Sequence, residues 1–144
     1  MPGEAGLKNE EARLEARLNS SCYVCGLDNP RGLHLVFERS EGGEMSATWT
    51  PDSTLEGFEG IVHGGLVSTV LDESMAKAVA ATGVEALTAE LRIRFRHHVI
   101  AGNPLVVCGW VTESSTRVIR AEAKLLDSAR MELAHGWSSF LVLR

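Results

Sequence analysis

Long hydrophobic runs are missing from this chain of 144 residues. No apolar stretch reaches the ~18 residues that a helix needs to span a bilayer. The N-terminal segment MPGEAGLKNEEARLEARLN is polar and acidic, and it has neither the basic start nor the apolar stretch of a secretory signal. We therefore expect a cytoplasmic protein that does not insert into membranes.

Cysteine and positive charge are also scarce. The three cysteines, Cys22, Cys25 and Cys108, are too few for a disulfide framework. Cys22 and Cys25 form a C-x-x-C pair, but no second close pair completes the four ligands of a structural zinc. We expect two thiols packed in a loop, with no metal and no cofactor. The net charge of −5 disfavours nucleic-acid binding, which depends on Lys and Arg neutralising phosphates.

Several catalytic and topological motifs are absent as well. There is no G-x-S-x-G elbow and no P-loop, which disfavours serine-based acyl transfer and nucleotide hydrolysis. Strands and helices do not alternate as they do in a doubly wound sheet. Internal repeats and low-complexity segments are missing too.

The elements that are present fit one domain, because a chain of this length can bury roughly 70% of its unfolded surface around a single core. We expect an N-terminal helical extension over residues 1–21, with a helix at 4–19, and one domain over residues 22–144. Alternating patterns predict two strands joined by a hairpin at 40–43 and, later in the chain, four strands separated by short hairpin breaks. Between these two groups we expect a loop at 51–60 and a long helix. The six expected strands cover residues 33–39, 44–50, 87–100, 104–113, 117–126 and 131–143.

The expected helix at 63–82 is apolar almost all round, so it must be buried. A single buried helix with about six antiparallel strands has few packing solutions. The sequence therefore predicts an α+β fold in which a curved antiparallel sheet of about six strands wraps around one long central helix.

The helix begins with His63-Gly64-Gly65. The first backbone N–H groups of a helix have no intrahelical partner, and the dipole favours negative charge there. Glycines let a ligand approach these groups closely, so the segment can stabilise an anion or a developing oxyanion. The alternative is that Gly64 and Gly65 only permit tight packing of the helix.

Two neighbouring carboxylates lie inside the helix. Glu73 has Lys77 four residues later, which predicts an ordinary ion pair. Asp72 lies on a small, largely apolar face without a cation, so desolvation would raise its pKa and suit it to act as a base or nucleophile. The alternative is a structural, hydrogen-bonded Asp72.

His63 and Asp72 are 2.5 turns and ~13 Å apart along the helix, so one helix cannot bring them into contact. This predicts a site between subunits in a homodimer or homotetramer.

The segments GFEGIVHGGLVSTVLDE, TAELRIRFRHHV and CYVCGLDNPRGLHLVF together resemble the hotdog-fold acyl-CoA thioesterases of the PaaI-like and thioesterase-superfamily-member type. The resemblance implies that His63, Gly64 and Gly65 form the helix start that polarises the thioester carbonyl. It also implies that Asp72 acts from the other subunit and that Thr88 helps to hold the water or the carboxylate. Some relatives have Asn or Gln where this chain has Gly57, so a polar group that could orient the water is missing.

These observations predict an enzyme that hydrolyses an acyl-CoA thioester to free acid and CoA. The rival interpretation is a non-catalytic acyl-CoA-binding module, and a hotdog dehydratase ranks third. Arg92, Arg94 and Arg96 alternate along one expected strand and therefore share a face. Arg94 and Arg96 are candidates for holding the CoA phosphates, and a solvated face or a subunit contact is the alternative. The sequence leaves the acyl group open.

Overall fold

A computed structural model describes residues 21–143, so the helix expected at 4–19 lies outside the described residues. The chain forms two compact units, Met1–Val36 and Phe37–Arg144. Among the described residues, no helix combines the length and hydropathy that crossing a membrane requires.

The described part of the first unit consists of turns, and the strand expected at 33–39 is wrong for most of its length. His34 has a φ of 55°, in the left-handed region that a strand does not contain. The N–H groups of Leu33 and Leu35 donate to Tyr23 O at 2.8 Å and Val24 O at 2.9 Å, within the same unit.

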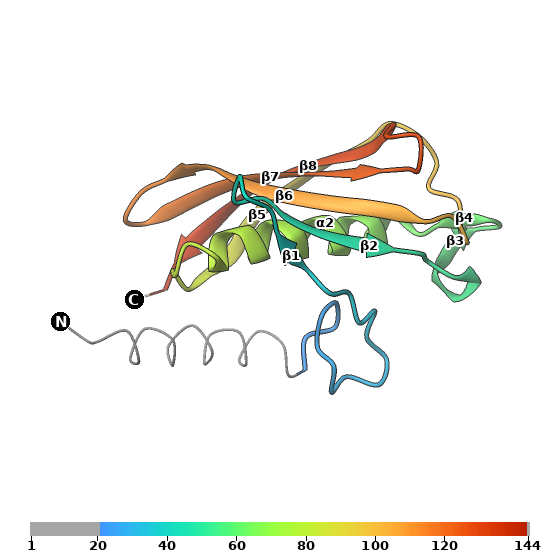
Figure 1. Cartoon of the computed structure of the whole chain (residues 1–144), viewed down its shortest axis with the longest axis horizontal. Coiled ribbons are helices and arrows are strands. Elements are labelled where there is room, and N and C mark those ends of the chain that lie inside the picture. Colours follow the sequence, from blue (N-terminus) through green and yellow to red (C-terminus); the bar gives the residue numbers. More distant parts are fainter. Residues whose placement is uncertain (1–20, 144) are drawn as a thin grey trace. The chain divides into compact units, whose positions relative to one another are not determined.

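The second unit is a six-stranded antiparallel sheet with one long helix, α2 (Gly64–Ala80), along one face (Figure 1). The strands lie in the order β1-β2-β6-β7-β8-β5. Their bounds are Glu38–Arg39 (β1), Met45–Trp49 (β2), Ala86–Phe95 (β5), Leu105–Ser114 (β6), Val118–Leu126 (β7) and Glu132–Val142 (β8). The predicted α+β hotdog arrangement is confirmed. The hairpin expected between the third and fourth strands is wrong, because β5 pairs with β8 while β6 pairs with β2 and β7.

Short elements replace the loop expected at 51–60 and carry the chain into the helix. They are a 3-10 turn, η1 (Ser53–Leu55), and a small hairpin of β3 (Glu56–Phe58) with β4 (Ile61–Val62). Gly60 turns this hairpin with a φ of 77°. The His63 N–H donates to Leu55 O at 2.9 Å, which fixes the residue before the helix.

Helix α2 buries one stripe of side chains against the sheet. The buried residues recur at helical spacing and are Val67, Val70, Leu71, Ser74, Met75, Ala78 and Val79. Each fully buried aliphatic side chain contributes about 1.5–3 kcal/mol. The helix approaches β6 so closely at Gly109 that a Cβ there would lie 2.5 Å from Ser74 O. The opposite side of the helix, which carries Asp72, is only half-buried.

The two faces of β5 point to different environments. A Cβ on Gly136 would lie 3.1 Å from the Met75 side chain, so Gly136 faces the helix and its neighbours His135 and Trp137 face away. Arg92 pairs with Trp137 and Arg94 with His135, so these arginines share the outer face. β5 is also an edge strand, with Leu87, Leu91 and Phe95 between 40% and 61% exposed.

Candidate active site

The imidazole of His63 caps the start of α2. His63 is the N-cap residue, and the Gly65 N–H donates to its Nδ1 at 2.9 Å. The backbone oxygen of His63 accepts from the N–H groups of Leu66 at 2.9 Å and Val67 at 3.2 Å. Within the described part of the chain, the Gly64 N–H has no acceptor. Of the two glycine N–H groups considered from the sequence, Gly64 is therefore the one left for a ligand oxygen, at the positive end of the helix dipole.

Side chains surround the glycines at this helix start. A Cβ on Gly64 would lie 3.3 Å from the Phe95 ring, and one on Gly65 would lie 3.0 Å from His63 Nδ1. A Cβ on Gly57 would lie 3.0 Å from His63 Cδ2. Close packing thus requires small residues here, and the packing and ligand-binding interpretations of Gly64 and Gly65 are compatible.

Asp72 contacts Thr88 across the gap between α2 and β5. The Thr88 Oγ1 donates to Asp72 Oδ1 at 2.8 Å, which leaves the second carboxylate oxygen for other contacts. Burial raises the pKa of Asp72, and the hydrogen bond from Thr88 lowers it by less. The direction matches the expectation from the apolar helix face. A half-buried carboxylate with a raised pKa and a fixed orientation is suited to take a proton or to attack carbon.

A bulge in β5 aims Thr88 at the helix. The register of β5 against β8 shifts between Thr88 and Glu90, so one extra residue stands between them. Strict alternation from Arg92 back along the strand would place Thr88 on the outer face with the arginines. The bulge reverses this, and no turn residue in the segment signals it.

One chain does not bring the helix start and Asp72 together. Gly64 and Asp72 are eight residues apart in α2, which corresponds to ~12 Å along the axis. Asp72 instead lies beside the exposed edge strand β5, through its contact with Thr88.

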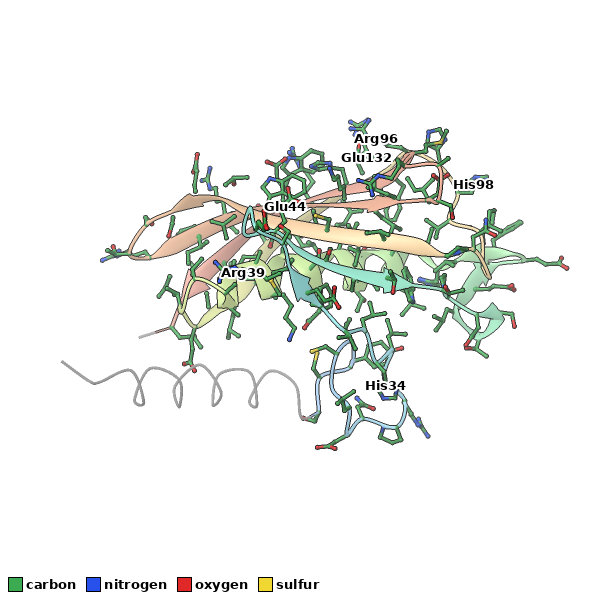
Figure 2. The ribbon with its side chains drawn as sticks, in the orientation of Figure 1. His34, Arg39, Glu44, Arg96, His98 and Glu132 are labelled. Carbon is green, nitrogen blue, oxygen red and sulfur yellow. The ribbon has the colours of Figure 1, made fainter. Side chains whose placement is uncertain are left out.

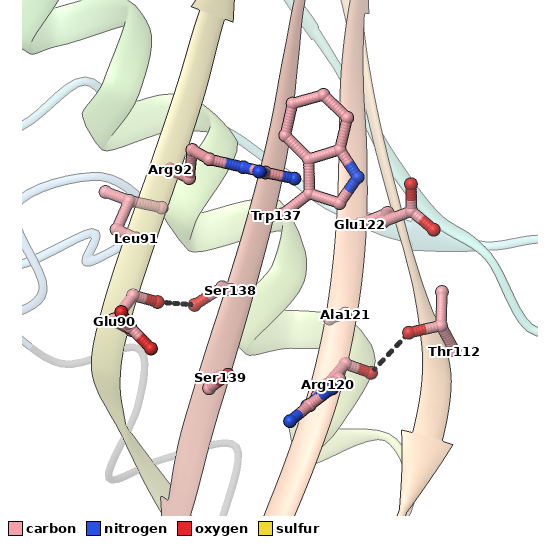
Figure 3. Close-up of a pocket in the computed structure, with 10 residues that line it drawn as sticks. All are labelled: Glu90, Leu91, Arg92, Thr112, Arg120, Ala121, Glu122, Trp137, Ser138 and Ser139. Carbon is pink, nitrogen blue, oxygen red and sulfur yellow. Dashed lines mark hydrogen bonds between the residues drawn. The ribbon is translucent and has the colours of Figure 1, made fainter.

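The arginines considered for CoA phosphates lie on the other side of the sheet. Arg96 Nε is 3.1 Å from Glu132 Oε2, and Figure 2 shows both side chains on the face away from α2. The Arg92 guanidinium lies over the Trp137 ring, 4.4 Å from its centroid, at a depression of about 400 Å³ (Figure 3). In one subunit these arginines are therefore separated from Asp72 by the sheet.

Cys108 is not a nucleophile. Burial raises the pKa of its thiol to about 12, and the hydrogen bond from its Sγ to Glu44 Oε2, at 3.0 Å, acts in the same direction. Because the thiolate is the reactive form, this cysteine stays inert at neutral pH.

A sequence model of the thioesterase superfamily matches residues 59–137, which is more than half of the chain and includes the helix start, Asp72 and Thr88. The chain belongs to the thioesterase superfamily. No match is found among curated proteins.

Solved structures with the same fold accompany this family match. A thioesterase superfamily protein is 24% identical with a TM-score of 0.78, over 82% of this chain and 61% of that chain, so this chain spans less than two thirds of that relative. The Escherichia coli PaaI protein of the phenylacetic acid degradation operon is 16% identical with a TM-score of 0.78, over 96% of both chains.

A hypothetical thioesterase of Streptococcus pneumoniae has been solved with coenzyme A. It is 15% identical with a TM-score of 0.71, over 76% of this chain and 85% of that chain. Two further structures of that protein carry alanine in place of an aspartate and of a threonine sixteen positions later.

Proposed function

We propose that this protein hydrolyses an acyl-CoA thioester to a free acid and CoA, with no metal or bound cofactor. The observation that carries the proposal is the contact between Thr88 Oγ1 and Asp72 Oδ1, at 2.8 Å, on a carboxylate whose pKa is raised by burial. A structural aspartate would gain most from a shielded, fully paired position, whereas Asp72 is half-buried and keeps one oxygen available.

The Streptococcus pneumoniae thioesterase supports the assignment of both residues. The substituted aspartate and threonine in that protein are sixteen positions apart, and Asp72 and Thr88 have the same separation. That protein has been solved with coenzyme A, which supports a CoA thioester as the substrate class here.

In the proposed reaction the thioester oxygen accepts a hydrogen bond from the Gly64 N–H. Asp72 takes a proton from water, the water oxygen attacks the carbonyl carbon, the C–S bond breaks, and the CoA thiolate takes up the proton. Alternatively, Asp72 itself attacks the carbon and CoA leaves as the thiolate. Water then hydrolyses the resulting anhydride, and the proton that this releases is taken up by the thiolate. Rapid quenching of a single turnover followed by mass spectrometry distinguishes the routes, because only the second leaves an acyl group on Asp72.

The complete site is proposed to form between two subunits. Asp72 lies beside the edge strand β5, while the Gly64 N–H is ~12 Å away along the helix. An exposed edge strand of ten residues with apolar side chains is a template for pairing with another chain. Pairing of two β5 strands would bring Asp72 of one subunit toward the helix start of the other, in a homodimer or a homotetramer built from such dimers.

A charge on the edge strand tests this assembly. Leu91→Lys is expected to give a monomer without activity, because a lysine on β5 disfavours strand pairing. Leu141→Lys is the matched control, since Leu141 is 53% exposed but lies on the inner strand β8, and it should remain assembled. Sedimentation velocity and activity would be measured together, and a fully active wild-type monomer would refute the shared site.

A thiol-release assay with a panel of aliphatic and aromatic acyl-CoAs tests the activity and identifies the acyl group. The alternative function is a non-catalytic acyl-CoA-binding module, which is favoured by Gly57, because this position carries no amide to orient water. Binding of acyl-CoA without release of thiol by the wild type would support the module and refute the hydrolase.

A further inference from the structure

The imidazole of His63 is held between two glycines. A Cβ on Gly65 would lie 3.2 Å from its Cε1, and a Cβ on Gly57 would lie 3.0 Å from its Cδ2. The ring therefore lies between the two glycines, and Nε2 is the ring atom that is bonded to both of these carbons. His63 is exposed, and among the described residues its Nε2 has no partner. The ring is therefore fixed with one nitrogen open to a ligand.

The hydrogen bond at the other ring nitrogen assigns the tautomer. His63 Nδ1 accepts the Gly65 N–H at 2.9 Å, so Nδ1 carries no proton. The proton of the neutral imidazole is then on Nε2, which becomes a donor. The helix start thus has two donors without acceptors in the described structure, the Gly64 N–H and the His63 Nε2–H.

Capping alone does not explain a histidine at this position. Ser, Thr, Asp and Asn are the favoured N-cap residues, and each accepts a backbone N–H through a short side chain. A histidine cap here also requires glycine at positions 57 and 65, where a Cβ would lie within about 3 Å of the ring. Histidine differs from serine in that it accepts the Gly65 N–H with one ring nitrogen, Nδ1, and has a second ring nitrogen, Nε2, that donates.

We infer that the His63 Nε2–H is the second hydrogen-bond donor to the thioester carbonyl oxygen, beside the Gly64 N–H, so that the cap residue is itself a catalytic residue. This inference rests on the proposed hydrolase function. Gly57 has a defined part in it, because its missing side chain makes room for the ring at the position where the resemblance leads one to expect a polar amide. In this inference His63, whose ring lies against Gly57, supplies the polar group in place of that amide.

Cap variants separate the two roles of the imidazole. His63→Ser retains a favourable N-cap, but its short side chain has no donor at the position of Nε2. His63→Asn retains the cap and adds a side-chain N–H. We expect kcat of His63→Ser to fall about 100-fold, the usual loss for one oxyanion donor. KM and Tm should change little, and His63→Asn should regain at least about tenfold over serine. The kcat and KM are measured with the acyl-CoA that the panel selects, with Asp72→Asn as the inactive reference.

The outcomes distinguish this inference from the proposed function. If the wild type releases no thiol, both fail. If the wild type is active, Asp72→Asn is inactive and His63→Ser stays within about threefold of the wild-type kcat, only the inference fails. Should the serine variant not fold, His63→Thr replaces it with the same cap chemistry. If the serine, threonine and asparagine variants all lose Tm, and their kcat values fall to the same extent, the ring is only structural. That result would overturn the inference.

Discussion

Replacing Asp72 by asparagine is expected to separate activity from stability. The side chain keeps its shape, and its amide oxygen can still accept the 2.8 Å hydrogen bond from Thr88. The reactive charge is lost, and a positioned base contributes 10²–10⁴-fold. We therefore expect kcat to fall at least about 100-fold, or about 2.7 kcal/mol of transition-state stabilisation. KM should change little, because the Gly64 N–H is untouched.

The stability of the same variant follows from the direction of the pKa shift. Burial raises the pKa of Asp72, so the folded protein binds this proton more tightly than the unfolded chain. The contribution of Asp72 to stability is therefore greatest while Asp72 is protonated, and it is lost as the pH rises from the ordinary Asp pKa, about 3.9, through the raised folded value. Asparagine has no charge to desolvate. Its Tm should exceed that of the wild type at pH 7, and the difference should vanish at acidic pH.

The neighbouring carboxylate provides the control. Glu73→Gln makes the same chemical change one residue along the helix, and we expect it to keep activity. Thermal unfolding at pH 7 and at acidic pH, together with steady-state kinetics, would be measured for both variants. If Glu73→Gln were inactive and Asp72→Asn active, the assignment of Asp72 would be wrong. If Asp72→Asn lost activity and Tm together, its role would be structural.

Three other variants and one control variant test separate parts of the structure. Thr88→Val removes the donor that lowers the pKa of Asp72, so the acid limb of the kcat–pH profile should move to higher pH; an unchanged profile would contradict the contact. If Arg94 on the outer face of a subunit holds the CoA phosphates, Arg94→Ala should raise KM for acyl-CoA more than for a truncated thioester without the nucleotide, and equal effects would count against phosphate binding. Gly109→Ala places a Cβ 2.5 Å from the backbone of α2 and should destabilise by at least about 1–3 kcal/mol in denaturant unfolding. Gly42→Ala, with its nearest atom 3.9 Å away, should leave stability nearly unchanged.

Elements with a strong local period could be predicted from the sequence. The helix expected at 63–82 is observed as Gly64–Ala80, and the strand expected at 117–126 as Val118–Leu126. In both segments the spacing of apolar side chains matches the repeat of the element, which is a property of neighbouring residues. The expectation of a single buried helix then left few packing arrangements, and this explains why the sheet around it was predicted as well.

Features that depend on distant residues could not be predicted in this way. The alternation of Leu33, Leu35 and Phe37 favours a strand, but most of this segment bonds to the turn that contains Tyr23 and Val24. The pairing of β5 with β8 joins segments separated by two other strands. A pattern of apolar residues indicates which faces are buried, but it carries no information about the neighbouring strand.

The residues of the candidate site were named from the sequence, but the division of work between them comes from the structure. A helix start with two glycines indicates free N–H groups, yet only the position of the His63 ring shows that the Gly65 N–H is occupied while the Gly64 N–H is not. Asp72 was selected because of its apolar face. Its partner Thr88 came only from the family resemblance, since no spacing rule connects residues on two different elements.

The bulge in β5 explains how one strand serves two purposes. Without it, the even-numbered residues of β5 would all face outward, and Thr88 would lie on the same face as Arg92 and Arg94. The single extra residue between Thr88 and Glu90 turns the first part of the strand toward α2 and leaves the arginines on the outer face. Bulges re-aim side chains at the expense of regular pairing, and they are over-represented beside active sites and at sheet edges. Here the bulge lies on the edge strand, next to a carboxylate that needs a partner, and a deletion that restored regular alternation would remove the Thr88 donor from Asp72.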